Sequence, residues 1–129
     1  MEIKKSYIPL NDLEVYKLAR ELSKKGWEIY KQMDWHIRKI NGDQFITSLD
    51  SIGANIAEGY GRYHYLDQIK FYYNARGSLF ESCNHWLEIL KERDLISEGS
   101  FDEMKTISEK LRMKLNNFIT TTYRQKKKQ

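Results

Sequence analysis

The chain has few of the residues that would cross-link it, break its helices or anchor it in a membrane. Its 129 residues include one proline, Pro9, and one cysteine, Cys83. A single cysteine excludes an internal disulfide and is typical of a reducing compartment, so we expect a cytoplasmic protein. No run approaches the roughly 20 apolar residues of a membrane span, and the first ten residues contain no apolar signal segment. We therefore expect neither secretion nor a membrane partner.

What remains is a composition that favours helices. Chains poor in proline and rich in lysine, glutamate and leucine form helices readily, and this length suits one domain with one core. Four segments carry apolar residues at helical spacing and are joined by short connections. The sequence therefore predicts an all-α protein, an antiparallel up-down four-helix bundle. We expect an N-terminal arm over residues 1–9, the bundle over 10–123 and a basic tail over 124–129.

The first two helices have recognisable signals. Asn11 or Asp12 is expected to cap the first helix, whose apolar face begins at Leu13. Gly26 interrupts this helix and indicates a close contact with a neighbouring helix. Residues 34–43 are predicted to form a connection or a loose helix start that packs onto the bundle through its apolar side chains. The second helix is predicted from Asp43 to about Tyr60, and the two apolar residues expected to hold the connection are Trp35 and Ile37.

The third helix is predicted to be the longest, from His64 or Tyr65 to about Arg93. Its apolar stripe is wide for a helix that buries one seam, which indicates contacts with two neighbours or with another subunit. A turn follows, and Ser100 with Glu103 resembles a capping box at the start of the fourth helix. The stripe of the third helix consists of Ile69, Tyr72, Tyr73, Leu79, Phe80, Cys83, Trp86, Leu87 and Leu90.

Small residues recur in the second helix in a regular pattern. Gly53, Ala57 and Gly61 are four apart and therefore share one helical face. Each glycine costs roughly 1 kcal/mol of helix stability relative to alanine, so a compensating interaction is expected. We interpret this face as a spacer that lets another helix approach closely. Gly59 and Gly61 flank Tyr60, where the helix is expected to end.

Residues 51–62, Ser-Ile-Gly-Ala-Asn-Ile-Ala-Glu-Gly-Tyr-Gly-Arg, resemble the signature of one bacterial family. These are the four-helix-bundle proteins encoded by intervening sequences of large-subunit ribosomal RNA genes. Residues 12–16 and 71–81 resemble the openings of the family's first and third helices, so the resemblance covers about residues 10–96. Many members have proline at the position of Gly53, and many have two arginines at the positions of Ile46 and Thr47. The motif residues carried over as architectural are Gly53, Asn55, Ala57, Glu58, Gly59, Gly61, Arg62 and Glu81.

The resemblance implies a ring-shaped homo-oligomer, a pentamer in relatives of known structure, and no established catalytic activity. It also implies a link to nucleic acid, because related accessory proteins of retroelements bind nucleic acid through basic surfaces. If the arginine pair of other members contacts nucleic acid, this chain lacks that contact.

Two sets of polar residues could in principle carry chemistry. Glu81, His85 and Glu88 share a helical face, but a ferritin-like site needs two Glu-x-x-His motifs, so a polar seam between helices is favoured over a metal. Asn55, Glu58 and Glu81 lack a nucleophile or oxyanion donor beside them. We expect Glu58 to pair with Arg62, and Asn55 or Glu81 to bond across the helix interface. Neither a catalytic residue nor a cofactor is predicted, and Cys83 is expected in the core.

Aromatic and basic residues point to partners. Tyr60, Tyr63, Tyr65, Tyr72 and Tyr73 gather near one turn; they suit an oligomer interface or, beside arginine and lysine, stacking on single-stranded bases. From Ser100 onward the charge is +5, from eight Lys or Arg and three Asp or Glu, whereas the rest of the chain carries −1. Lysines and arginines there could contact phosphates or simply solubilise a tail. The predicted phosphate contacts are Arg112, Arg124, Lys126, Lys127 and Lys128.

The sequence thus supports three hypotheses in order. The first is a non-enzymatic oligomeric bundle that binds RNA or DNA with low sequence specificity. The second is a protein-interaction scaffold without nucleic-acid affinity, which would leave an exposed apolar patch. The third is an enzyme, which would require a deep pocket around Glu58 or Glu81.

Overall fold

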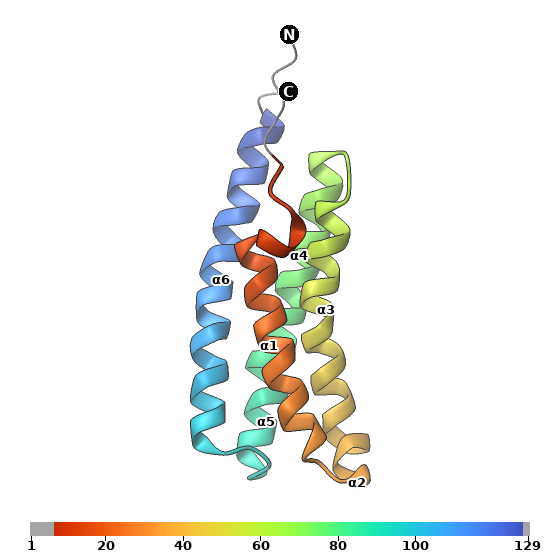
Figure 1. Cartoon of the computed structure of the whole chain (residues 1–129), viewed down its shortest axis with the longest axis vertical. Coiled ribbons are helices and arrows are strands. Elements are labelled where there is room, and N and C mark those ends of the chain that lie inside the picture. The colour runs from red at the N-terminus through yellow and green to blue at the C-terminus, as the bar shows by residue number, and fades with distance from the viewer. Residues whose placement is uncertain (1–6, 128–129) are drawn as a thin grey trace.

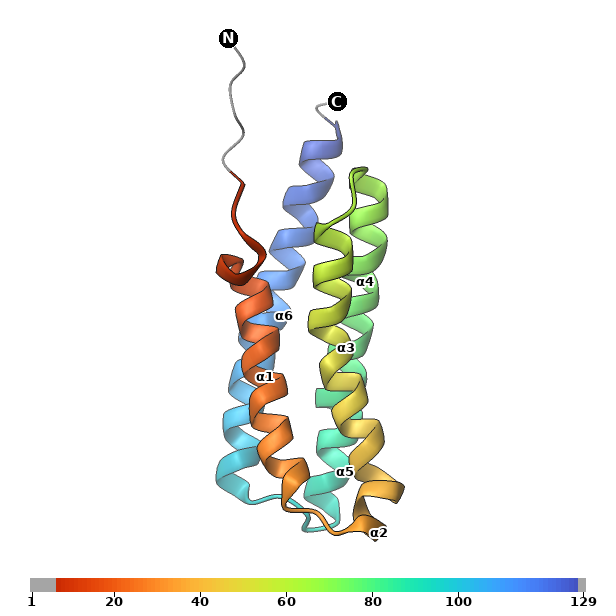
Figure 2. The same ribbon diagram turned by 45° about the vertical axis from the view of Figure 1, so that its right-hand side comes forward.

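The computed structural model describes residues 7–127, and these are helical without any strand. Four long segments form the bundle: α1 (Glu14–Lys31), α3 (Asp43–Tyr60), α4 (Tyr65–Phe80) with its continuation, and α6 (Glu98–Lys127). The continuation of α4 consists of a π-helical segment, η3 (Glu81–Trp86), and α5 (Leu87–Glu92). Successive segments run in opposite directions along the long axis (Figures 1 and 2). The predicted four-helix bundle is confirmed.

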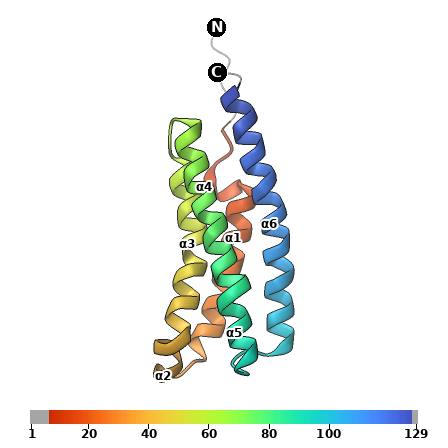
Figure 3. The ribbon, with the colours of Figure 1, turned by 180° about the vertical axis from the view of Figure 1, so that it is seen from behind.

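Each long helix packs against two others. α3 lies between α1 and α4, and α6 closes the bundle against α1 and α4 (Figure 3). Every helix sends an apolar stripe to one core, whose largest fully buried side chains include Tyr72, Phe45, Leu22, Leu49 and Leu115. Burial of such side chains contributes about 1.5–3 kcal/mol each and is the main stabilising term. Cys83 lies in this core, with none of its surface exposed.

The start of α1 differs from the expected cap. Residues 10–12 form a 3₁₀ turn, η1 (Leu10–Asp12), and Leu13 precedes the helix without a side-chain cap. The N–H of Asp12 donates to the carbonyl of Pro9, and that of Leu13 to the carbonyl of Leu10. The prediction that Asn11 or Asp12 caps α1 is therefore wrong, because both residues belong to the turn that precedes the helix.

The connection between α1 and α3 is helical almost throughout. Asp34 caps the short α2 (Trp35–Ile37) by accepting a hydrogen bond from the N–H of Ile37 at 2.9 Å. A π-helical segment, η2 (Arg38–Gly42), then leads directly into α3. Ile37 is half-buried against the core, but Trp35 is 73% exposed. The expectation that Trp35 packs onto the bundle is therefore wrong.

Three glycines lie where α3 meets its neighbours, and two of them, Gly26 and Gly59, leave no room for a side chain. A side chain at Gly53 would touch Ala19 and Tyr16 of α1 at 3.7 Å, so this position lies against a neighbouring helix. A side chain at Gly59 would come within 2.7 Å of Tyr72 and 2.9 Å of Phe71. Gly26 of α1 lies directly against Leu49, as its expected close contact requires. Gly61 is exposed and approaches only carbonyls of its own helix, so its expected contact with another helix is not made.

The turn between α5 and α6 is compact and ends in an N-cap. Asp94 has a φ of 55°, the only positive value among non-glycine residues in the described part of the chain. The Oγ of Ser97 accepts a hydrogen bond from the N–H of Ser100 at 3.1 Å. The helix thus begins at Glu98, and the predicted capping box of Ser100 and Glu103 is wrong, because Glu103 instead pairs with Lys25 of α1. Within residues 7–127 no helix is both long enough and apolar enough to cross a membrane.

Candidate nucleic-acid interface

The second half of α6 and the residues after it have a one-sided charge. No Asp or Glu follows Glu109, whereas seven Lys or Arg do: Lys110, Arg112, Lys114, Arg124, Lys126, Lys127 and Lys128. α6 continues through Lys127, so the residues expected in a separate tail extend the helix instead. Its C-terminal end rises above the tops of the other helices (Figure 1). Arg124 and Lys126 therefore belong to α6 rather than to a separate tail.

The cations along α6 differ in what they contact. Arg112 is bound to Glu109 by two hydrogen bonds, at 3.2 and 3.0 Å, and Lys114 pairs with Glu14 of α1 at 3.6 Å. Lys105 contacts Glu88 and the carbonyl of Cys83, both at 2.6 Å. Arg124 and Lys126, by contrast, are exposed and form no ion pair with the described residues. Lys127 has a described backbone only, and Lys128 lies outside the described residues.

The tyrosines predicted to cluster are divided among different surroundings. Tyr72 is 1% exposed, its ring packs on Phe118, and burial raises the pKa of its hydroxyl. Tyr60 donates a hydrogen bond to the carbonyl of Ile8 at 2.5 Å, which ties the arm to the bundle. Tyr65 donates to Gln125 of α6 at 3.1 Å, whereas Tyr63 is 87% exposed. These side chains do not form one stacking surface.

The polar motif residues form local contacts. Glu58 pairs with Arg62 at 3.3 Å, as expected, and Arg62 also covers the ring of Phe71. Asn55 donates to the carbonyl of Ser51 at 2.8 Å, one turn earlier in its own helix. Glu81 accepts from the indole N–H of Trp86 at 2.9 Å, also in its own helical segment. The prediction of a bond across the helix interface from Asn55 or Glu81 is therefore wrong.

Of the three residues predicted to form a polar seam, Glu88 reaches another helix. Glu88 reaches Lys105 of α6 at 2.6 Å, while His85 packs edge to face on Trp86. Among the described residues no three His, Cys, Asp or Glu side chains gather as a metal site would require. His64 occupies the N-cap position of α4, but its side chain makes no capping bond.

Hollows on the surface of the described residues include three open ones, and none of these three is lined by Glu58 or Glu81. One, of about 720 Å³, lies at the lower end of the bundle between α1 and the turn before α6. A second, of about 550 Å³, is a groove between α4 and α6. The third, also about 550 Å³, lies beside the arm. The groove between α4 and α6 is lined by Tyr73, Arg76, Gly77, Leu79, Phe80, Asn84, Ser108, Arg112 and Asn116.

A second group of aromatic and basic residues lies at the lower end of the bundle, where sequence reasoning did not place a site. Trp27 stacks on Tyr30 with 5.3 Å between ring centroids, and Arg38 lies 4.6 Å from the centroid of the Tyr30 ring. Lys39 lies 5.0 Å from the centroid of the Trp35 ring. The sequence feature that could have predicted this group is residue spacing. Trp27 and Tyr30 are three residues apart and Trp35 and Lys39 are four apart, which puts each pair on one helical face.

Comparison with known proteins agrees with the motifs. Residues 11–117 match the family model described as 23S rRNA-intervening sequence protein. A crystal structure of a protein of unknown function from the S23 ribosomal protein family of Bacteroides thetaiotaomicron VPI-5482 superposes with a TM-score of 0.73. The two chains are 22% identical, over 81% of this chain and 97% of that one. No curated protein matches the chain. At 22% identity the structural similarity supports the fold and carries no information about function.

Proposed function

The chain belongs to the family of 23S rRNA-intervening sequence proteins, and we propose that it is a non-enzymatic, oligomeric helical bundle that binds RNA or DNA through the phosphate backbone. The observation that supports this proposal is the absence of any acidic residue after Glu109 combined with seven Lys or Arg. A surface of one sign attracts a polyanion, and each phosphate neutralised releases a condensed counterion. Phosphate contacts carry no base information, so little sequence preference is expected.

Within this surface the contribution of each cation follows from its contacts. Arg124 and Lys126 are exposed and free to meet a phosphate without losing another partner. Arg112 must exchange its two hydrogen bonds to Glu109 for a phosphate, so its contribution should be smaller. Lys127 and Lys128 continue the basic run in sequence. Cations at the C-terminal end of a helix also interact favourably with the helix dipole. The alternative that an experiment must exclude is therefore that these cations only stabilise α6.

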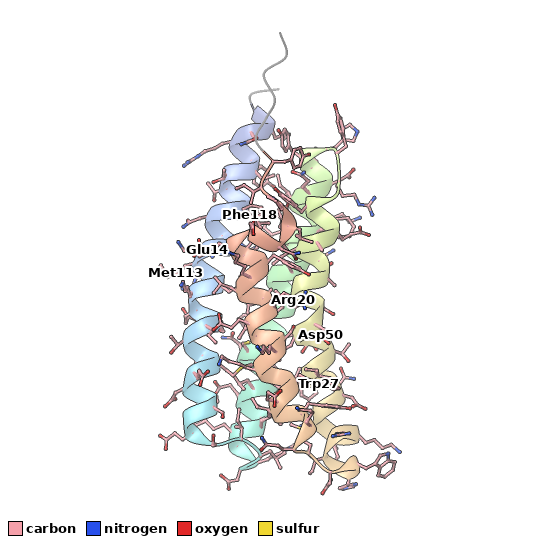
Figure 4. The ribbon with its side chains drawn as sticks, in the orientation of Figure 1. Glu14, Arg20, Trp27, Asp50, Met113 and Phe118 are labelled. Carbon is pink, nitrogen blue, oxygen red and sulfur yellow. The ribbon has the colours of Figure 1, made fainter. Side chains whose placement is uncertain are left out.

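The groove between α4 and α6 is our candidate for contact with a second copy of the chain. Phe80 is 67% exposed beside it, and Met113 of α6 is 59% exposed and points away from the bundle (Figure 4). Met113 does not line the groove, but exposed large apolar side chains are typical of association surfaces. Arg76, which covers the ring of Tyr73, and Arg112 line the same groove, and arginine with aromatic residues is enriched in interfaces.

Binding to structured RNA at a series of salt concentrations tests the proposal. The double variant Arg124→Gln/Lys126→Gln should reduce the slope of log K against log salt by about two, one for each phosphate contact. The control Lys17→Gln/Lys70→Gln removes the same charge from exposed positions on α1 and α4 and should leave the slope unchanged. Absence of binding at low salt, or equal slopes for both variants, would refute the proposal.

A second candidate function, favoured by the exposed groove, is a protein-interaction scaffold. It requires a stable oligomer that has no affinity for nucleic acid. Light-scattering mass, measured together with the ratio of absorbance at 260 and 280 nm of the purified protein, separates the two. An oligomer free of nucleic acid that also fails to shift RNA at low salt would favour the scaffold.

A further inference from the structure

We propose that the lower end of the bundle is a stacking platform for the unpaired bases of single-stranded nucleic acid. The platform consists of Trp27, Tyr30, Trp35, Arg38 and Lys39. This inference deepens the proposed function and rests on it, because it assigns single-stranded segments to one end of the molecule and backbone contacts to the other. It uses residues different from those assigned to phosphate binding.

The two tryptophan rings of the platform are exposed, whereas Tyr30 is partly buried and contacts Trp27 and Arg38. Trp35 is 73% exposed and Trp27 is 50% exposed, and Figure 4 places Trp27 near the end of α1 that is far from the chain termini. Trp86, the third tryptophan, instead packs against the core and donates its indole N–H to Glu81. Exposed indoles forgo the burial that normally stabilises large apolar side chains. A flat π surface left open to solvent is what a base stacks on.

Two of the three rings are accompanied by a cation. Arg38 lies over Tyr30, and Lys39 lies over Trp35. Arginine and lysine beside aromatic rings let a single strand stack its bases while its phosphates meet positive charge. This combination fits a nucleic-acid strand better than an apolar protein surface, which would leave both cations unpaired on burial.

The acidic residues nearby are already engaged. Asp34 accepts from the N–H of Ile37 at 2.9 Å, and Asp43 accepts from the hydroxyl of Tyr30 at 2.6 Å. Glu28 pairs with Lys31 at 3.2 Å. Their charges are therefore partly compensated by local donors, whereas Arg38 and Lys39 form no ion pair with the described residues. The three carboxylates balance Lys31, Arg38 and Lys39 in formal charge, and Arg38 and Lys39 are the cations that can meet a phosphate without breaking an ion pair.

Two members of the platform, Tyr30 and Arg38, are held in place before a ligand arrives. Arg38 donates to the carbonyls of Tyr30 and Lys31, at 3.3 and 3.0 Å, and so closes the C-terminal end of α1. The bond from Tyr30 to Asp43 joins α1 to the start of α3. Rings and charges fixed by such contacts lose little conformational freedom on binding, which favours affinity.

The two sites lie far apart, which makes them separable by experiment. α6 has 30 residues and spans about 45 Å, and the platform lies at the end opposite its C-terminus. An oligothymidylate of about six nucleotides, within the site sizes known for single-strand binding, probes the platform. A 20-base-pair duplex of unrelated sequence, which offers no unpaired bases, probes the backbone contacts.

The test compares Trp35→Ala and Trp27→Ala with Leu66→Ala, a control that removes another exposed apolar side chain, 55% exposed, outside both sites. Each tryptophan variant should weaken oligothymidylate binding about tenfold, and the control and the affinity for the duplex should remain within about twofold. In a Trp86→Phe background, the oligonucleotide should quench the fluorescence of the two remaining indoles. Circular dichroism verifies that the variants remain helical.

Several outcomes would overturn the platform, and they differ from the failure of the proposed function. Duplex binding without oligothymidylate binding, or equal affinities for wild type and both tryptophan variants, refutes the platform alone. A tryptophan variant that changes the light-scattering mass but not the affinity assigns this end to contact between proteins and also refutes it. No binding of either probe at low salt refutes the platform and the proposed function together.

Discussion

Glycine has opposite roles at different positions of this chain, depending on what surrounds its missing side chain. At Gly59 a methyl group would meet Tyr72, Phe71 and the backbone carbonyl of Gln68 at 2.7, 2.9 and 3.0 Å. At Gly99, in the first turn of α6, nothing lies within 4 Å. The first glycine allows α3 and α4 to approach where the chain reverses between them. The second has no packing role and costs stability through the entropy of the unfolded chain.

The same substitution should therefore have opposite effects at these two positions. We expect Gly59→Ala to lower the free energy of unfolding by about 1–3 kcal/mol, because the contacts include a rigid backbone carbonyl. Gly99→Ala should raise it by about 0.5 kcal/mol. Urea unfolding followed by circular dichroism measures both. Equal changes in the two variants would contradict the assignment of Gly59 as the closest point between α3 and α4.

The spacing of small residues predicted this kind of contact but not its exact position. Gly53 lies against α1, as a spacer should. Gly61 lies past the last turn of α3, beyond the reach of a neighbouring helix. The sequence marks Gly59 only as a residue at the helix end, yet of Gly53, Gly59 and Gly61 it has the tightest surroundings. A pattern in one helix identifies a face, whereas the partner that meets it depends on tertiary packing.

At the scale of elements, the end of α5 has the hydrogen bonds of a Schellman motif. The N–H of Leu95 donates to the carbonyl of Leu90 at 2.8 Å, and that of Asp94 to the carbonyl of Lys91 at 3.1 Å. The motif requires a left-handed residue at the position of Asp94, usually glycine. Asp94 adopts this conformation with a φ of 55°, at a cost of roughly 1 kcal/mol.

Replacing Asp94 with glycine should relieve this cost. We expect Asp94→Gly to raise the free energy of unfolding by about 0.5 kcal/mol, since greater freedom of the unfolded chain offsets part of the gain. Asp94→Ala removes the same charge but keeps a Cβ atom in the left-handed region, so it should not stabilise. Thermal unfolding of both variants at one protein concentration separates backbone strain from charge. A stabilised alanine variant would point to charge.

The elements themselves were largely predictable, while their ends and irregular turns were not. Apolar periodicity predicted α3 from Asp43 to Tyr60 and the long helix that begins at Tyr65. Ser97 and Ser100 are both good caps, and in the structure Ser97 caps α6 while Glu103 pairs with Lys25. The π-helical segments η2 and η3 have no sequence signature, because they widen the helix by one residue per turn without changing which residue types it accepts.

The platform at the lower end was missed for a related reason. Periodicity assigns aromatic residues to the core by default, and Trp35 follows a helix cap where packing is expected. Its exposure depends on how α2 projects from the bundle (Figure 2). The cationic end of α6, by contrast, was predictable from the sequence, because a run of like charges can be identified without knowing how the helices pack.

At the scale of the whole molecule, the core holds groups that must stay protonated. Burial raises the pKa of the Cys83 thiol above its ordinary value of 9.0, and that of the Tyr72 hydroxyl above 10.0. In the unfolded chain both groups ionise near their ordinary values. At a pH between the unfolded-state pKa and the raised folded-state pKa, the unfolded chain binds fewer protons than the folded one. The free energy of unfolding therefore keeps its full value below about pH 9 and falls as the pH rises.

Tyr72→Phe isolates one of these contributions, because it removes the titrating hydroxyl and keeps the ring that packs on Phe118. Above pH 10 the free energy of unfolding should fall with pH more steeply for wild type than for the variant. The difference between the two slopes should be about 1.4 kcal/mol per pH unit. Urea unfolding at pH 8, 9, 10 and 11 measures the difference, and Tyr63→Phe, at a tyrosine 87% exposed, is the matched control. Parallel curves for wild type and Tyr72→Phe would mean that the hydroxyl ionises as readily in the folded bundle as in the unfolded chain, which a core closed around Tyr72 does not permit.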